Sequence, residues 1–115
     1  MGILEPLMVA LVSLAGSSWV SHENAKQSVE FSTSLISGNA GCNEFSGTYV
    51  QTKSGVKIGH LSTTRMACKP EIMENEHKFL VALANTAKVE TSRSTLILKD
   101  ANGMVLFALN RKNVG

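Results

Sequence analysis

The side chains with reactive chemistry in this 115-residue chain are two cysteines, three histidines and a scatter of acidic residues. Cys42 and Cys68 leave three roles open: a disulfide, two buried thiols that pack as small hydrophobic groups, or a catalytic nucleophile. The catalytic role is the least favoured, because no cysteine-protease signature surrounds either residue.

The histidines give no metal-binding pattern. His22, His60 and His77 are far apart in the chain, and neither C-x2–4-C nor H-x3–5-H spacing occurs. We expect each to be a surface or strand-face residue. A Gly-x-Ser-x-Gly nucleophile elbow and a Gly-x4-Gly-Lys-Ser/Thr phosphate loop are also absent from the sequence. The sequence therefore predicts no catalytic residue, no metal and no cofactor.

Glu76 is the acidic residue that breaks its local pattern. It falls in the middle of an apolar stripe at helical spacing, where a carboxylate is rarely buried without partners. The stripe consists of Ile72, Met73, Phe79, Leu80 and Leu83. Glu76 is either an acid/base group with a shifted pKa or a structural anchor that accepts hydrogen bonds from loop N–H groups or from Arg65. We favour the anchor, because no second acid is placed to work with it.

Glycines concentrate beside Cys42. Residues 38–49 read GNAGCNEFSGTY and contain Gly38, Gly41 and Gly47 among asparagine and serine residues. Glycine permits positive φ or close backbone approach, and asparagine tolerates turn conformations. The segment is predicted to be a compact loop between two strands. Asn43 is expected to anchor that loop.

The helix that carries Glu76 is predicted to begin at Pro70, where the missing N–H costs nothing, and to end near Asn85. Seven or eight short antiparallel strands surround it. They are expected at 17–22, 29–36, 45–51, 56–58, 88–91, 95–99 and 104–109. The predicted fold class is α+β and mostly β: an antiparallel, curved, barrel-like sheet with a single α-helix packed on it.

Composition narrows the class of protein. With 43% hydrophobic and 17% charged residues, the chain is globular rather than disordered. A net charge of +2 with scattered Lys and Arg, together with one Trp and one Tyr, argues against nucleic-acid binding. No apolar run approaches the ~18 residues of a membrane span.

Residues 14–112 are predicted to form one domain, preceded by a lead-in at residues 1–13. Residues 7–15 resemble the apolar region of a signal peptide, but Glu5 stands where a cation is expected. Residues 14–17 read LAGS, which resembles a lipoprotein cleavage motif with Ser17 in place of the lipidated cysteine. We interpret the lead-in as an introduced start or as a signal or lipoprotein remnant, which leaves a lipid-anchored context open.

Three segments together resemble the META domain family, which includes HslJ-like heat-shock proteins of bacteria. They are GNAGCNEFSGTY, IGHLSTTRMAC and ENEHKFLVAL, and the resemblance covers about residues 14–110. The matching positions are Gly38, Gly41, Cys42, Asn43, Phe45, Gly47, Tyr49, Gly59, Leu61, Thr64, Met66, Ala67, Cys68, Glu76, Phe79, Leu80 and Leu83. The resemblance implies a small bacterial envelope domain, and no reaction is commonly attached to the family.

An envelope domain of this size with an even cysteine count favours a Cys42–Cys68 disulfide over two free thiols. We assign structural roles to the other motif residues. These are Gly38, Gly41, Asn43, Phe45, Gly47, Arg65, Met66, Glu76 and Phe79.

The function expected from the sequence is a non-enzymatic, stress-related or interaction domain of the periplasm or cell envelope. Its partner would be an unidentified protein or small ligand, and the domain is expected to be a monomer. The first alternative is a barrel that binds a small ligand, and the second is an enzyme centred on Glu76 or a cysteine.

Overall fold

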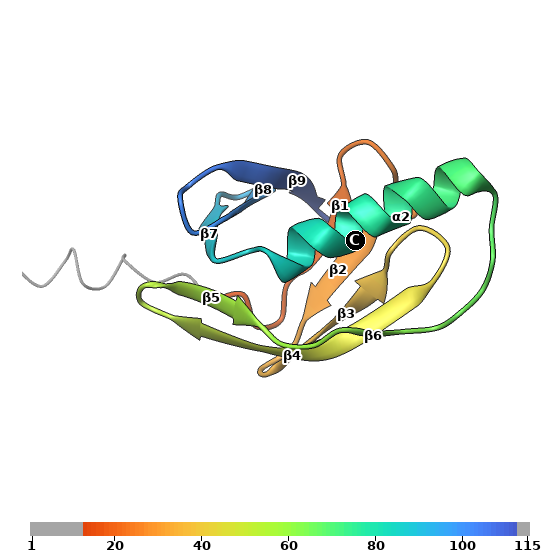
Figure 1. Ribbon diagram of the computed structural model, residues 1–115. Coiled ribbons are helices and arrows are strands. Elements are labelled where there is room, and N and C mark those ends of the chain that lie inside the picture. The colour runs from red at the N-terminus through yellow and green to blue at the C-terminus, as the bar shows by residue number, and fades with distance from the viewer. Residues whose placement is uncertain (1–12, 113–115) are drawn as a thin grey trace, which may run out of the picture.

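The computed structural model describes residues 13–112, which form nine strands and one α-helix (Figure 1). The strands are β1 (Ser18–Ser21), β2 (Ser28–Phe31), β3 (Leu35–Asn39), β4 (Glu44–Thr52), β5 (Gly55–Ile58), β6 (Ser62–Thr63), β7 (Lys88–Thr91), β8 (Thr95–Lys99) and β9 (Val105–Arg111). The helix α2 spans Pro70–Ala84, as the position of Pro70 predicts. The predicted lead-in lies outside the described residues, apart from Ser13.

All neighbouring strands pair antiparallel in the order β5-β4-β3-β2-β1-β9-β8-β7, and β6 pairs with β4 beside β5. The backbone N–H of Val56 in β5 donates to the carbonyl of Ala87, just before β7, at 2.9 Å. This bond brings the two ends of the sheet together, so the sheet nearly closes into a barrel. Helix α2 lies across the curved sheet (Figure 1). The predicted fold class is therefore confirmed.

The predicted single strand at 29–36 is wrong, because this segment is a hairpin. Phe31 in β2 pairs directly with Ile36 in β3. Between them, the Ser32 N–H donates to the Leu35 carbonyl at 2.9 Å, and the Ser32 hydroxyl accepts from the Leu35 N–H at 3.2 Å. Serine hydroxyls offer the backbone a turn in place of a ladder, so the polar residues 32–34 end β2.

The predicted glycine loop is shorter than expected, since Gly38 lies inside β3 and Gly47 lies inside β4. A Cβ on Gly38 would stand 2.0 Å from the Ser28 carbonyl oxygen, and one on Gly47 would stand 2.6 Å from that of His60. These two glycines permit close backbone approach and do not make the turn.

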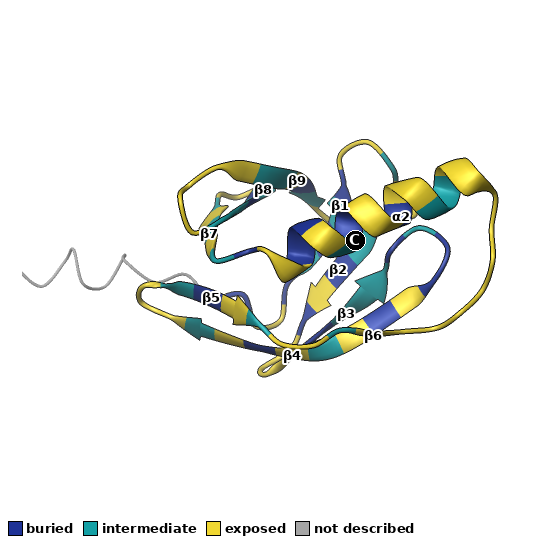
Figure 2. Ribbon diagram, viewed as in Figure 1, coloured by how far each residue is buried: buried dark blue, intermediate teal, exposed yellow. Residues whose placement is uncertain are grey.

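Side chains from the sheet and the helix meet in one core, and strands such as β2 and β4 alternate buried residues with exposed ones (Figure 2). Phe79 of α2 is fully buried and makes edge-on ring contacts with Phe45 at 6.0 Å and Phe107 at 5.0 Å between centroids. Val81, which is not part of the apolar stripe, is exposed. Phe79 therefore attaches the helix to two distant parts of the sheet.

The segment that resembles a lipoprotein motif is part of this fold. Leu14 is buried, and the Ser17 hydroxyl donates to its carbonyl oxygen. The indole N–H of Trp19 donates in turn to the Ser17 oxygen at 2.8 Å. Within residues 13–112, no helix is long and apolar enough to cross a membrane.

We expect Gly38→Ala to lower the free energy of unfolding by more than about 2 kcal/mol, because its methyl group would overlap the Ser28 carbonyl. Ser37→Ala is the control, since the Ser37 side chain has no hydrogen bond among residues 13–112, and a change within about 0.5 kcal/mol is expected. Urea denaturation measures both. A Gly38→Ala protein as stable as wild type would contradict the close-approach role.

Candidate functional site

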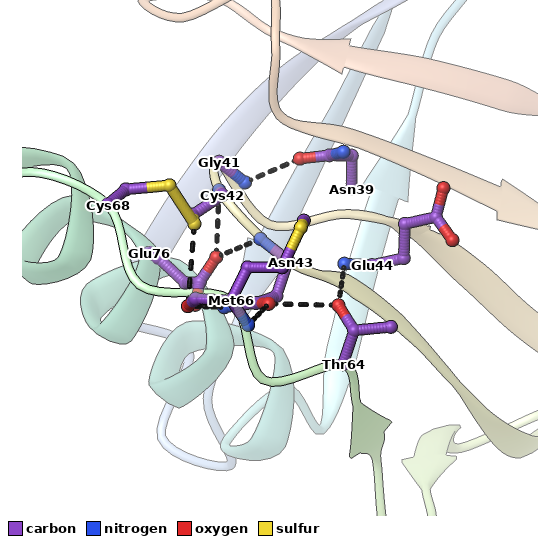
Figure 3. Close-up of a disulfide and its surroundings, with 9 residues drawn as sticks. All are labelled: Asn39, Gly41, Cys42, Asn43, Glu44, Thr64, Met66, Cys68 and Glu76. Atoms are coloured by element: carbon purple, nitrogen blue, oxygen red, sulfur yellow. Dashed lines mark hydrogen bonds between the residues drawn. A yellow bond between two sulfur atoms is a disulfide. The ribbon is translucent and has the colours of Figure 1, made fainter.

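The sequence-predicted residues meet where the turn between β3 and β4 and the loop after β6 approach helix α2 (Figure 3). Cys42 in the turn and Cys68 in the loop form a disulfide, with 6.1 Å between their Cα atoms. The bond predicted between these residues is therefore formed. We call this assembly the clamp, defined by Cys42, Asn43, Met66, Cys68 and Glu76.

Glu76 lies at the centre of the clamp and is 5% exposed. Its Oε1 accepts from the backbone N–H of Cys42 at 2.8 Å and of Asn43 at 2.6 Å. Its Oε2 accepts from the Asn43 side-chain amide at 2.8 Å. The donors are thus the loop amides, one of the two expected kinds. The Arg65 alternative is wrong, because that side chain is exposed and is not among the donors.

Asn43 extends the network from the helix to the loop after β6. Its Oδ1 accepts from the Met66 N–H at 2.6 Å and from the Thr64 hydroxyl at 2.9 Å. Its amide also donates to the Met66 carbonyl at 3.1 Å. The two Met66 bonds fix which end of the Asn43 amide faces Glu76, because a flipped amide would place its N–H against the Met66 N–H and its oxygen against the Met66 carbonyl. Asn43 therefore holds three segments together.

The turn itself is shaped by its own sequence. The Asn39 side chain accepts from the Gly41 N–H at 2.8 Å, and the Ala40 N–H donates to the Asn43 carbonyl at 2.8 Å. Gly41 has φ of +132°, a conformation that side chains disfavour. Together these features direct two consecutive N–H groups, those of Cys42 and Asn43, toward one carboxylate oxygen.

Gln27 is a buried member of this region that the sequence analysis missed. It is 4% exposed, and its amide donates to the Ala40 carbonyl at 3.1 Å and to the Asn75 carbonyl at 3.3 Å. Position 27 keeps the alternation of Val29 and Phe31, the two following inward residues. Extending that alternation by one step would have predicted Gln27 to face inward.

Burial raises the pKa of Glu76, but its hydrogen bonds with the Asn43 amide, the Asn43 N–H and the Cys42 N–H lower the pKa, and the net pKa lies below its ordinary value. The carboxylate is therefore ionised at neutral pH. Because both of its oxygens already accept bonds inside the clamp, it is poorly placed to exchange a proton with a substrate. The geometry fits the anchor role.

The remaining predicted residues do not gather into a reactive site. His22 contacts the Asn110 amide at 3.0 Å. His60 and His77 line a groove of about 300 Å³ between α2 and the segment before β6. Within residues 13–112 no three His, Cys, Asp or Glu residues are grouped so as to hold a metal ion.

Two hollows lie on the outer face of the sheet. One of about 630 Å³ and one of about 550 Å³ adjoin, because both are lined by Glu30, Ser37, Ser46 and Ser62. We call the pair the outer groove. It lies on the face of β2, β3 and β4 opposite the core and contains no clamp residue.

A mostly β barrel whose single helix is fastened by a disulfide and a buried carboxylate is the class of protein that these features define. A model of the META domain matches residues 9–113. The chain belongs to the META domain family, which confirms the resemblance noted in the sequence.

Solved structures share the fold. A protein from Burkholderia xenovorans, solved by NMR, is 25% identical with a TM-score of 0.68, and the match covers 88% of this chain and 85% of that one. A second NMR structure is 24% identical with a TM-score of 0.63, covering 89% and 95% of the respective chains. A DUF4847 family protein from Bacteroides vulgatus is 15% identical with a TM-score of 0.59, covering 76% and 60%. No curated protein matches the chain.

We expect Glu76→Ala to lose on the order of 2–4 kcal/mol of stability, because three buried donors lose their acceptor. Glu76→Gln keeps the acceptor for both backbone N–H groups but turns an amide N–H toward the Asn43 amide, so it should lose about 1–2 kcal/mol. Glu74→Ala, at an exposed position of the same helix, is the control and should stay within about 0.5 kcal/mol. Chemical denaturation of the three variants decides the matter, and equal stability of Glu76→Ala and wild type would rule out the anchor.

The lowered pKa of Glu76 also predicts a pH dependence. A carboxylate whose folded pKa lies below its unfolded value stabilises the fold above the unfolded pKa, about 4.3, and loses that contribution as pH falls through the folded pKa. The stability difference between wild type and Glu76→Gln should therefore be constant near neutral pH and shrink below about pH 4.3. Urea titrations across this range measure it. A difference independent of pH would show that the pKa of Glu76 is the same in the folded and unfolded states.

Proposed function

We propose that this domain is a non-enzymatic binding module of the bacterial cell envelope and that the outer groove is its contact surface. The observation that carries the proposal is that the polar groups of the clamp are hydrogen-bonded within residues 13–112, whereas several of those in the outer groove are not. In the clamp, the Glu76 oxygens and the Asn43 amide are all engaged within the protein. In the outer groove, the side chains of Glu30, Ser37 and Ser46 have no hydrogen-bond partner among residues 13–112 and remain available to a ligand.

Binding in the barrel interior, the first alternative, has less support. The interior is occupied by large side chains that are at most 1% exposed, including Trp19, Phe79, Ile36, Leu96 and Leu98. Three edge-on aromatic contacts bind this core together. A small ligand would have to displace packed side chains there, whereas the outer groove is already open.

An enzyme, the second alternative, would need a reactive group that reaches a substrate. Both cysteines are joined in the disulfide, and Glu76 is enclosed by its donors. The groove carboxylates Glu30 and Glu44 are exposed. This arrangement supports a binding module over an enzyme. The stress-related part of the proposal rests only on membership of the META domain family.

The disulfide supports the proposed envelope location. Disulfides persist in oxidising compartments, and closing a loop with a sequence separation of 26 contributes about 3–4 kcal/mol in the chain-entropy model. We expect the protein to occur in the envelope fraction with no free thiol when cells are alkylated before lysis. Two alkylated cysteines in a cytosolic fraction would contradict the location.

The binding role is tested by NMR titration of the purified, oxidised domain with classes of envelope component: saccharides, peptides and lipid headgroups. At least one class should shift the amide signals of Ser37, Ser46 and Ser62 and be recovered chemically unchanged. The Ser46→Arg variant should not bind, because its long side chain should block the groove. The matched control is Thr95→Arg on the distant strand β8, which should bind as wild type does. Conversion of any component, or shifts confined to residues outside the groove, would overturn the proposal.

A further inference from the structure

The outer groove contains a regular row of polar side chains that crosses five strands. In the pairing of neighbouring strands, Ser18 stands opposite Glu30, Glu30 opposite Ser37, Ser37 opposite Ser46, and Ser46 opposite Ser62. Directly paired residues project on the same face of an antiparallel sheet. We call this set, Ser18, Glu30, Ser37, Ser46 and Ser62, the serine row. With strands about 4.8 Å apart, the row extends over about 19 Å.

Every member of the serine row lines the outer groove, and none of the five side chains has a hydrogen-bond partner among residues 13–112. In β2, β3 and β4, neighbours of the row along the chain face the core, namely Val29, Phe31, Ile36 and Phe45. The row is therefore held on a rigid base. Four hydroxyl groups and one carboxylate are presented at regular intervals, each able to bond a ligand.

The charge of the groove decides which ligands it favours. Glu30 and Glu44 contribute two carboxylates, and no Lys, Arg or His is among the residues that line the groove. An anionic chain such as a nucleic acid or an acidic polysaccharide would meet like charge with no compensating cation. An amine would find a charge-assisted partner in Glu30, flanked in the row by Ser18 and Ser37.

The backbone pairing decides against a peptide. The strands β1, β2 and β3 each pair with a neighbour on both sides, so their face offers no free N–H or C=O edge to which a peptide strand could add. A peptide lying across the strands would leave its own backbone groups without partners. A saccharide presents hydroxyl groups that can both donate to and accept from serine hydroxyls at each step of the row.

We propose that the serine row binds an oligosaccharide that carries free amino groups, its sugar hydroxyls bonded to the serines and an ammonium group bonded to Glu30. This assignment rests on the proposed function, because it names the ligand class of the same groove. The Phe31 and Phe45 rings are buried in the core, so recognition depends on polar contacts without ring stacking. Repetition along the row therefore supplies the affinity, and a single sugar should bind far more weakly than a tetramer.

The test is an NMR titration of the oxidised domain with four probes at a pH where amines are charged. The probes are a glucosamine tetramer, cellotetraose, an N-acetylglucosamine tetramer and spermidine. The glucosamine tetramer should bind and shift the amides of Ser37, Ser46 and Ser62. The two neutral tetramers, which lack the ammonium group, should bind about three- to five-fold more weakly. Spermidine, which lacks hydroxyls, should also bind more weakly.

Variants assign the contacts. Glu30→Gln should reduce the affinity for the glucosamine tetramer to that for cellotetraose, whereas Glu74→Gln on the helix should leave it unchanged. The double variant Ser37→Ala/Ser46→Ala should weaken both tetramers about ten-fold. All four positions are exposed or half-buried, and their side chains lack hydrogen-bond partners within residues 13–112. The fold should therefore be retained, as the amide spectrum of each variant will show.

The proposal is overturned if spermidine binds as tightly as the glucosamine tetramer, if Glu30→Gln binds as wild type does, or if the tetramer produces no shift in the groove. A failure of the saccharide assignment can be distinguished from a failure of the proposed function. If another envelope component shifts the groove amides while the glucosamine tetramer does not, only the saccharide assignment fails. If no component shifts them, the groove is not a binding surface and the proposed function fails with it.

Discussion

The fold depends on the hydrogen bonds of one buried carboxylate, that of Glu76. Placing the Glu76 charge out of water is costly unless several donors surround it. The donors here come from a turn 33 and 34 residues earlier in the chain, and the acceptor comes from the helix. Helix, turn and the loop after β6 must therefore assemble together, because a partial assembly would leave the charge or the N–H groups without partners. The disulfide makes that assembly less costly by restricting the unfolded chain between Cys42 and Cys68.

The clamp also positions the hydrophobic core. Phe79 follows Glu76 by three residues, so it lies on nearly the same side of the helix and enters the sheet between Phe45 and Phe107. Phe45 in turn follows Asn43 by two residues at the start of β4. The polar contacts therefore fix the register at which the aromatic rings meet. The hydrogen-bonded residues and the buried rings are therefore neighbours in the same two segments, the start of β4 and helix α2. This explains why the residues that define the fold are concentrated in short motifs.

The sequence predicted the features that depend on residues close together in the chain. The helix bounds followed from Pro70 and the apolar stripe, and the burial of Glu76 followed from its place in that stripe. Features that depend on distant backbone were missed. The position of Gly38 beside the Ser28 carbonyl exists only once β2 and β3 pair, and the sequence could not show which of two donors reaches Glu76. The hairpin at 32–34 was missed because its serines fit an alternating strand as well as a turn.

The clamp and the outer groove have no residue in common, but they are connected through neighbouring residues and hydrogen bonds. Glu44 lines the groove with its side chain, while its backbone N–H donates to the Thr64 hydroxyl at 3.1 Å, and that hydroxyl donates to Asn43. Strand β6 contributes Ser62 to the end of the serine row, yet it pairs with only Phe45 and Ser46 of β4. The loop that follows β6 is held by Asn43 and by the disulfide. Because so short a strand has little stability of its own, the end of the groove depends on the clamp, and the oxidised state of the two cysteines becomes a condition for the shape of the proposed contact surface.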